Sequence, residues 1–76
     1  MPVLPSLKPR EVVRAFERMG YRQYRQRGSH LIMVKDGSSH QPVIPIHARD
    51  IKKGTLRAII RQAGLTVEEF LEFAKK

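Results

Sequence analysis

The chain contains no cysteine, and several kinds of chemistry are excluded by that absence. The chain can form no disulfide and no thiolate metal site, and it has no cysteine nucleophile. Any nucleophilic chemistry must therefore use a group other than a thiol. Long apolar runs are also missing. No stretch approaches the roughly 20 residues that span a bilayer, and residues 1–7 lack the apolar core of a signal peptide. We therefore expect a cytoplasmic protein with no membrane partner.

Acidic side chains are scarce as well. The chain has 7 Asp and Glu against 15 Lys and Arg, which gives a formal net charge of +8 on 76 residues. This excess favours a polyanionic partner, although a solubilising surface or a basic face that docks on an acidic protein would have the same composition. The length supports one domain with a modest core, which we expect to span residues 1–76.

Apolar residues recur at helical spacing in three segments, at 9–19, 53–63 and 67–74. Pro9 suits the first position of a helix, because its fixed backbone angle is already helical and no donor is lost there. Thr66 and Glu69 have the spacing of a capping box at the start of the third segment. The sequence therefore predicts three helices.

Three segments between the first two helices are predicted to be strands. Residues 21–26 suit a half-exposed strand, 29–35 holds four consecutive apolar residues typical of a central strand, and 42–46 has two prolines, which favour an edge. The resulting order is α-β-β-β-α-α. It predicts an α+β fold with a three-stranded antiparallel sheet, helices on one face and the other face free to bind a ligand.

The 3 histidines are the candidate chemical groups. They occupy positions 30, 40 and 47 without HxH or HxxxH spacing, so we expect no metal and no other cofactor. RNA brings its own nucleophile, the ribose 2′-OH, and its cleavage needs only proton transfer near pH 7 and cations on the phosphate. His30 is the best candidate for proton transfer. Strand alternation also places it on a face with Ile32 and Val34, so a partly buried structural histidine fits the same pattern.

Small and basic residues surround His30 in the sequence. Gly28 permits close backbone approach, Ser29 offers a hydroxyl, and cations lie on the same hairpin. A second group of cations lies at the predicted start of the 53–63 helix, where free N–H groups also favour phosphate. The candidate RNA-binding residues are Gly28, Ser29, Arg25, Arg27, Lys35, Lys52, Lys53 and Arg57. Tyr21 and Tyr24 can either stack on bases or pack in the fold.

Six short segments, spread over nearly the whole chain, together form a pattern specific enough to be compared with known families. They are Lys8-Pro9-Arg10-Glu11-Val12-Val13, Met19-Gly20-Tyr21, Gly28-Ser29-His30, Val43-Ile44-Pro45-Ile46-His47, Lys53-Gly54-Thr55-Leu56-Arg57 and Gln62-Ala63-Gly64-Leu65-Thr66. With these segments the chain resembles the HicA (YcfA-like) family of mRNA interferase toxins. The resemblance implies a fold like the double-stranded RNA-binding domain, metal-independent cleavage of mRNA, and a HicB-type antitoxin. It also implies a catalytic histidine in the Gly-Ser-His motif.

The chain departs from this family pattern at some positions. Many relatives carry a second histidine directly after the catalytic one and an aromatic residue two positions later, where this chain has Leu31 and Met33. The position of His30 alone therefore matches the catalytic one. His47, in a Pro-x-His segment that the family commonly has, is a possible second acid or base, or else a structural residue that bonds backbone at the entry to a helix.

Two other functions fit parts of the sequence. A non-catalytic RNA-binding module would have the same fold and charge. A DNA-binding helix-turn-helix over 56–62 and 67–74 fits less well, because Glu68, Glu69 and Glu72 would crowd its recognition helix, and we expect no direct DNA binding. An acidic antitoxin that covers the basic face is compatible with RNA cleavage, and we expect it to occlude His30.

Overall fold

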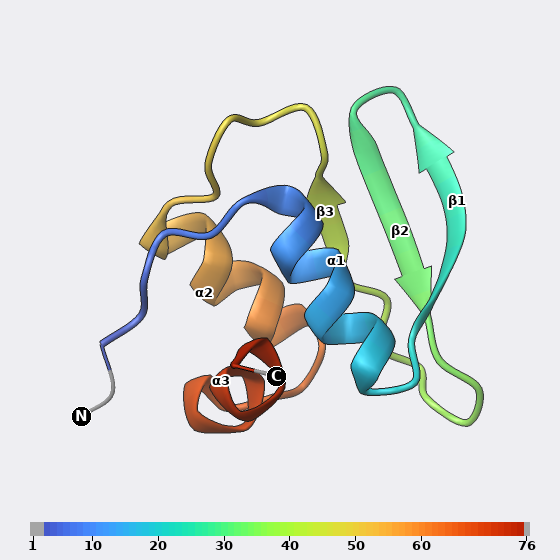
Figure 1. The fold of residues 1–76 in the computed structure, drawn as a ribbon. Coiled ribbons are helices and arrows are strands. Elements are labelled where there is room, and N and C mark those ends of the chain that lie inside the picture. Colours follow the sequence, from blue (N-terminus) through green and yellow to red (C-terminus); the bar gives the residue numbers. More distant parts are fainter. Residues whose placement is uncertain (1–2, 76) are drawn as a thin grey trace.

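The structure is a computed structural model and describes residues 3–75. Its elements follow the order expected from the sequence. They are α1 (Pro9–Arg18), β1 (Arg22–Arg27), β2 (His30–Val34), β3 (Val43–Pro45), α2 (Lys53–Gln62) and α3 (Val67–Ala74), as Figure 1 shows. The α+β class and the likeness to a double-stranded RNA-binding domain are therefore confirmed.

The sheet is antiparallel with the strand order β1-β2-β3, so β2 is central and β3 lies at an edge, as its prolines predicted. An edge strand leaves some of its backbone N–H groups without a partner strand, and Pro45 has no N–H group. The N–H of Val43, in the same strand, donates to the Gln62 side chain at 3.2 Å and so joins this edge to α2. β1 begins one residue later than expected. The N–H of Tyr21 donates to the Phe16 carbonyl at 3.0 Å, which keeps Tyr21 in the turn after α1.

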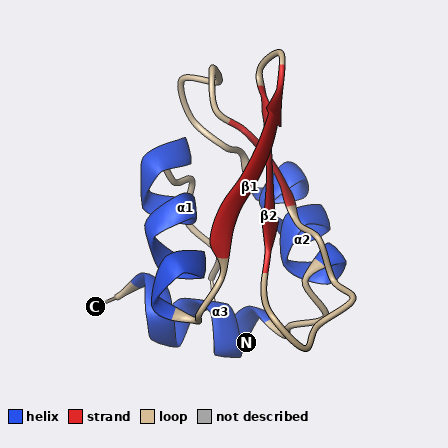
Figure 2. Cartoon of the chain, turned by 90° about the vertical axis from the view of Figure 1, so that its right-hand side faces the viewer, coloured by secondary structure: helices blue, strands red, loops and turns tan. Residues whose placement is uncertain are grey.

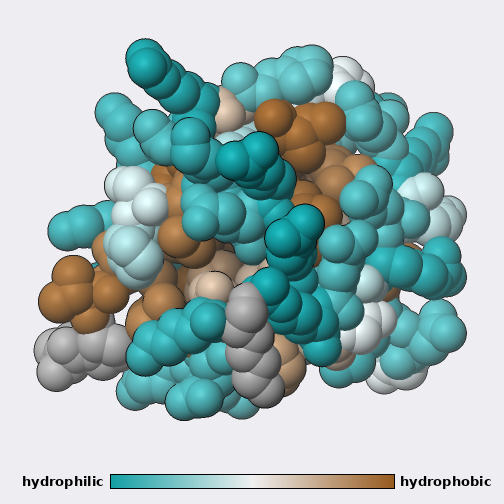
Figure 3. All heavy atoms as spheres, viewed as in Figure 1, coloured by the Kyte–Doolittle hydropathy of each residue, from teal (hydrophilic) through white to brown (hydrophobic). Residues whose placement is uncertain are grey.

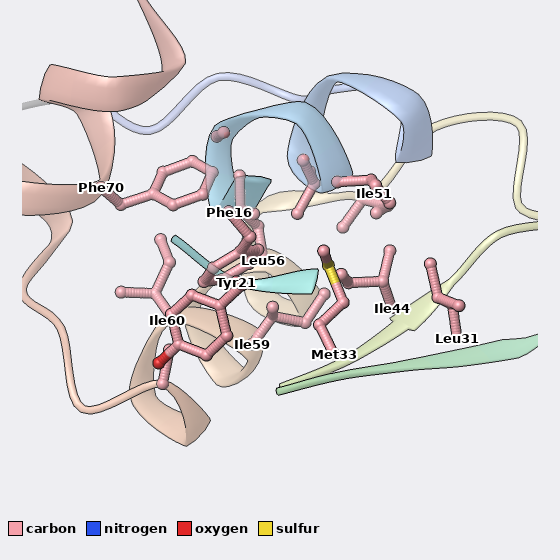
Figure 4. Close-up of a cluster of buried hydrophobic side chains, with 14 of the residues drawn as sticks. Phe16, Tyr21, Leu31, Met33, Ile44, Ile51, Leu56, Ile59, Ile60 and Phe70 are labelled. Carbon is pink, nitrogen blue, oxygen red and sulfur yellow. The ribbon is translucent and has the colours of Figure 1, made fainter. Parts of the chain in front are cut away.

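The hydrophobic core lies on one face of the sheet, and all three helices contribute to it. From the sheet come Leu31 and Met33 of β2 and Ile44 of β3, each less than a tenth exposed. From the helices come Phe16, Leu56 and Phe70, which are fully buried beside them (Figure 4). Burying such a side chain contributes roughly 1.5–3 kcal/mol. The alternation of β2 therefore fixes which face is covered.

The helix ends agree with the sequence pattern. The Thr66 hydroxyl accepts the Glu69 N–H at 3.1 Å, and the Glu69 carboxylate accepts the Thr66 N–H at 2.9 Å, which is the predicted capping box. Arg18 in turn donates to the Phe73 carbonyl at 2.8 Å and links α1 to α3. The outer side of α3 is acidic, because Glu68, Glu69 and Glu72 are all exposed.

The outside of the molecule is mostly polar. In the view that has α1 in front, hydrophilic side chains dominate, and hydrophobic ones form small patches between them (Figure 3). No helix in residues 3–75 is long and apolar enough to cross a membrane. Figure 2, which looks onto β1, shows the β1–β2 hairpin extending beyond the ends of α1 and α2.

Candidate functional site

The face of the sheet that the helices leave uncovered is called the open face here. Residues directly opposite one another on paired strands point to the same side of a sheet. Because Leu31 and Met33 point into the core, the other residues of β2 point to the open face. Their partners on β1 point there too. The pairs are His30 with Arg27, Ile32 with Arg25 and Val34 with Arg22.

A β-bulge in β1 brings Arg25 and Arg27 to this face. The pairing register shifts between Gln23 and Arg25, so that Tyr24 is left without a partner. Strict alternation from Arg22 would have pointed Arg25 and Arg27 toward α1. One extra residue reverses the alternation beyond it, which is how bulges re-aim side chains. The sequence did not predict this bulge, since the strand has no buried residue to mark its inner face and its one aromatic side chain, Tyr24, is exposed.

His30 is the group on the open face that can transfer protons at neutral pH. It is exposed, and no hydrogen bond joins its side chain to any other part of residues 3–75. It is therefore not the partly buried structural histidine that strand alternation also allowed. Arg27 lies directly across the ladder from it, at a Cα separation of about 4.5–5.5 Å for such pairs.

The charges of Arg25 and Arg27 are not neutralised by neighbouring carboxylates. Among residues 3–75, the ion pair that the side chains form is Arg22 with Asp36 at 3.6 Å, and it leaves both other arginines unpaired. Both are exposed. The open face thus presents two unpaired guanidinium groups near an exposed imidazole, and guanidinium groups bind phosphate in a bidentate manner.

The turn between β1 and β2 requires a residue with a left-handed backbone conformation. Gly28 has a φ of 59°, in the left-handed region that glycine adopts most easily, and a Cβ at this position would meet no atom within 4 Å. Its carbonyl accepts a hydrogen bond from the Gln26 side chain at 3.0 Å. The Ser29 carbonyl accepts the Ile46 N–H at 2.8 Å and joins the turn to the chain after β3. Both residues therefore shape the backbone that carries His30.

Lys35 does not lie with these residues. Its ammonium group is 5.8 Å from the centre of the ring of Tyr21, which lies in the turn after α1. His30 opens β2 and Lys35 follows the last residue of that strand, so the two are separated by the length of the strand. Tyr21 is 6% exposed and packs edge-on against Phe16 at 5.3 Å, so it is a core residue. Tyr24, by contrast, is 59% exposed.

Two of the cations near the start of α2 point away from His30. All the cations there are exposed, and Lys52 precedes the first helical residue. At about 100° per residue, Lys53 and Arg57 leave the helix on the side roughly opposite Thr55. Thr55 faces His30, as described next, so the structure does not bring Lys53 and Arg57 toward the imidazole.

A hollow of about 420 Å³ adjoins His30 on the side away from β1. Val43 and Pro45 of β3 line one wall of it, and Thr55, Ala58, Ile59 and Gln62 of α2 line the other. α2 lies beside β3 in Figure 1, so the hollow is the seam between them. His30 therefore has the arginines of β1 on one side and a largely apolar hollow on the other.

The remaining two histidines lie at opposite ends of the molecule. His47 is exposed in the turn after β3. The segment that follows β3 lies at the same end of the molecule as the β1–β2 turn (Figures 1 and 2). The described residues give the His47 side chain no hydrogen bond, so the backbone contact expected of a structural His47 is not found there. His40 lies in the loop between β2 and β3 against Gly64, where an added Cβ would be 2.6 Å from Nε2. Within residues 3–75, no three His, Asp or Glu side chains gather as a metal site.

The chain was compared with known protein families and with curated proteins. Residues 9–65 match the family described as HicA toxin of bacterial toxin-antitoxin, which covers well over half of the chain. No curated protein matches the sequence. The matched range contains His30, the arginines of β1 and both walls of the hollow. The chain therefore belongs to the HicA toxin family of bacterial toxin–antitoxin systems.

Proposed function

We propose that this toxin is a metal-independent endoribonuclease that cleaves mRNA, with His30 as its general acid or base. The observation that carries the proposal is the placement of an exposed imidazole directly across the ladder from Arg27, with Arg25 on the same face. Residues 1–76 would act as a single RNA-binding and ribonuclease domain, and mRNA as substrate implies action in the cytoplasm.

The chemistry needs no group beyond the chain and its substrate. His30 takes the proton of the ribose 2′-OH, and the oxygen attacks the adjacent phosphorus while the bond to the 5′ oxygen breaks. The products are a 2′,3′-cyclic phosphate and a 5′-OH, which takes up one proton. Arg25 and Arg27 stabilise the charge that develops on the phosphate oxygens. His47, at the same end of the molecule, is our candidate for the group that supplies the second proton.

Several other residues have supporting roles in this proposal. Gly28 and Ser29 shape the turn that holds His30 and leave space for the RNA backbone. Lys52, Lys53, Arg57 and Lys35 would contact phosphates farther along the strand, where they add affinity and no chemistry. No cofactor and no DNA partner form part of the proposal.

The test is cleavage of a purified RNA in EDTA by the wild type and by His30→Ala. We expect the variant to lose about 10²–10⁴-fold in rate, which is the usual contribution of general acid–base catalysis. His40→Ala is the matched control, since it removes an exposed histidine that lies against Gly64, beyond the other end of β2 from His30. Wild-type products should end in 2′,3′-cyclic phosphate. Unchanged cutting by His30→Ala would rule out its role, and RNA binding without cutting by the wild type would favour the non-catalytic module.

A HicB-type antitoxin is the proposed protein partner. Toxins of this kind are paired with an antitoxin, and the unpaired arginines of the open face suit an acidic surface. Covering that face would block RNA and His30 together. In a complex structure we expect carboxylates of the antitoxin within ion-pair distance of Arg25 and Arg27. A complex that leaves His30 and both arginines open to solvent would contradict direct blocking.

A further inference from the structure

The hollow between β3 and α2 has no role in the proposed chemistry, although His30 forms part of its wall. We propose that it is a nucleobase subsite, which holds the base of a nucleotide next to the cleaved phosphate. The inference rests on the proposed function, because the position of that phosphate follows from His30. It adds a contact that decides how the RNA lies across the open face.

The two sides of His30 differ in what they can bind. On the β1 side lie the guanidinium groups of Arg25 and Arg27, which suit a phosphate. On the other side lie Pro45, Ala58 and the buried Ile59, which suit the apolar face of a base. The volume of about 420 Å³ is within the roughly 300–1,000 Å³ of small-ligand sites. A nucleotide whose phosphate is held by the arginines can therefore place its base in the hollow.

The polar groups of the hollow favour an occupant that can accept a hydrogen bond. Gln62 accepts the Val43 N–H through Oε1 at 3.2 Å, so the orientation of its amide is set by a backbone donor. Its Nε2 group then keeps two N–H donors, and the exposed Thr55 adds a hydroxyl that can donate or accept. The occupant should therefore present an acceptor, either a carbonyl oxygen or an unprotonated ring nitrogen. A nucleobase combines such an acceptor with an apolar face.

The first experiment fills the hollow. Ala58→Leu adds bulk at an exposed helical position where leucine is a good helix former, so the fold should persist. Ser39→Leu, in the exposed loop between β2 and β3, is the matched control outside the hollow. Binding is measured by anisotropy with a 2′-O-methyl oligonucleotide, which lacks the attacking hydroxyl, and cleavage with the natural RNA. We expect Ala58→Leu to weaken binding about tenfold, in the range of one lost base contact, and Ser39→Leu to match the wild type.

The second experiment removes one base at a time. An abasic nucleotide at the position that the hollow holds should weaken binding by the wild type about tenfold and leave binding by Ala58→Leu unchanged. Gln62→Glu keeps an oxygen for the Val43 N–H and removes both amide donors, so base preference at that position should change. Gln41→Glu carries the same added charge in an exposed loop, and we expect it to leave the preference unchanged.

The outcomes separate this inference from the proposed function. If the wild type cleaves RNA through His30 and Ala58→Leu binds and cleaves equally well, the hollow is empty in the complex and the inference is wrong. If the abasic nucleotide weakens binding equally in the wild type and in Ala58→Leu, the inference is also wrong. If the wild type neither binds nor cleaves RNA, the proposed function and the inference fail together.

Discussion

Two basic regions of the molecule have similar composition and different placement. On β1, Arg25 and Arg27 share a sheet face with His30 and have no carboxylate partner among the described residues. At the start of α2, Lys53 and Arg57 are equally exposed but leave the helix away from the hollow beside His30. Both regions add to the net charge of +8, which attracts a polyanion from any direction. In the proposed cleavage, only cations that reach the same phosphate as the imidazole can assist the chemistry, so the position of a cation matters more than the total charge.

Replacing Arg25 and Arg27 together with alanine should have the largest effect. The change removes both guanidinium groups that share the open face with His30. We expect cleavage to fall by about 10³-fold or more, since one lost transition-state donor already costs about 10²–10³-fold. Lys53→Ala/Arg57→Ala removes the same charge at the start of α2 and is the control, with circular dichroism melting to verify both folds. Full activity of the folded Arg25→Ala/Arg27→Ala variant would show that these arginines take no part in cleavage.

Single substitutions compare the two regions directly. Arg27→Ala should lower kcat about 10²-fold, because it removes the guanidinium directly opposite His30. Arg57→Ala should change kcat by less than about threefold and act mainly on KM, as expected of a phosphate contact remote from the reaction. Steady-state cleavage of a short RNA supplies both constants. Equal losses in kcat from the two variants would remove the distinction between the regions.

Salt dependence shows how many phosphates each region contacts. Replacing Arg25 and Arg27 together with alanine should lower the slope of log K against log salt concentration by about 1.4, for two phosphate contacts on a single strand. Replacing Lys53 and Arg57 together should lower it by no more than that, since each contacts at most one phosphate farther along the strand. The measurement uses a 2′-O-methyl oligonucleotide at several salt concentrations. A larger change for the α2 pair would make that helix the main electrostatic contact.

Lys35→Ala should have the smallest effect on activity. Its ammonium group lies over the ring of Tyr21, beyond the end of β2 far from His30. We expect cleavage to change by less than about twofold and stability to fall by about 0.5–1 kcal/mol, which is the usual contribution of an exposed cation–π contact. Cleavage assays and thermal melting check the two values. A tenfold loss of cleavage would contradict the assignment of Lys35 as a remote phosphate contact with no part in the chemistry.

Much of the architecture followed from local sequence patterns. The three helices occupy the predicted segments to within a residue or so, and the capping box of Thr66 and Glu69 is formed. The two prolines of the third strand predicted its edge position. The choice of His30 also came from the sequence, through the Gly-Ser-His motif. These features depend on residues close together in the chain, so their spacing is visible without a fold.

The composition of the candidate site depended on long-range structure. The sequence allowed base stacking or core packing for both Tyr21 and Tyr24. In the structure Tyr21 packs against Phe16, and Tyr24 is exposed at the bulge. The sequence grouped Lys35 with Arg25 and Arg27 because all lie on one hairpin, and the structure separates it from them. A side chain's face depends on the register between strands, and an unpaired residue changes that register without changing the composition.

The sequence by itself determined the helices, the central strand and the basic character of the protein, and it singled out His30 as the candidate for proton transfer. Tertiary structure alone decided which cations lie beside that histidine and what lies on its other side. The bulge at Tyr24 turned Arg25 and Arg27 to the open face, and the packing of α2 against β3 formed the hollow next to His30. Both results depend on pairing between segments distant in the chain, which local spacing does not encode.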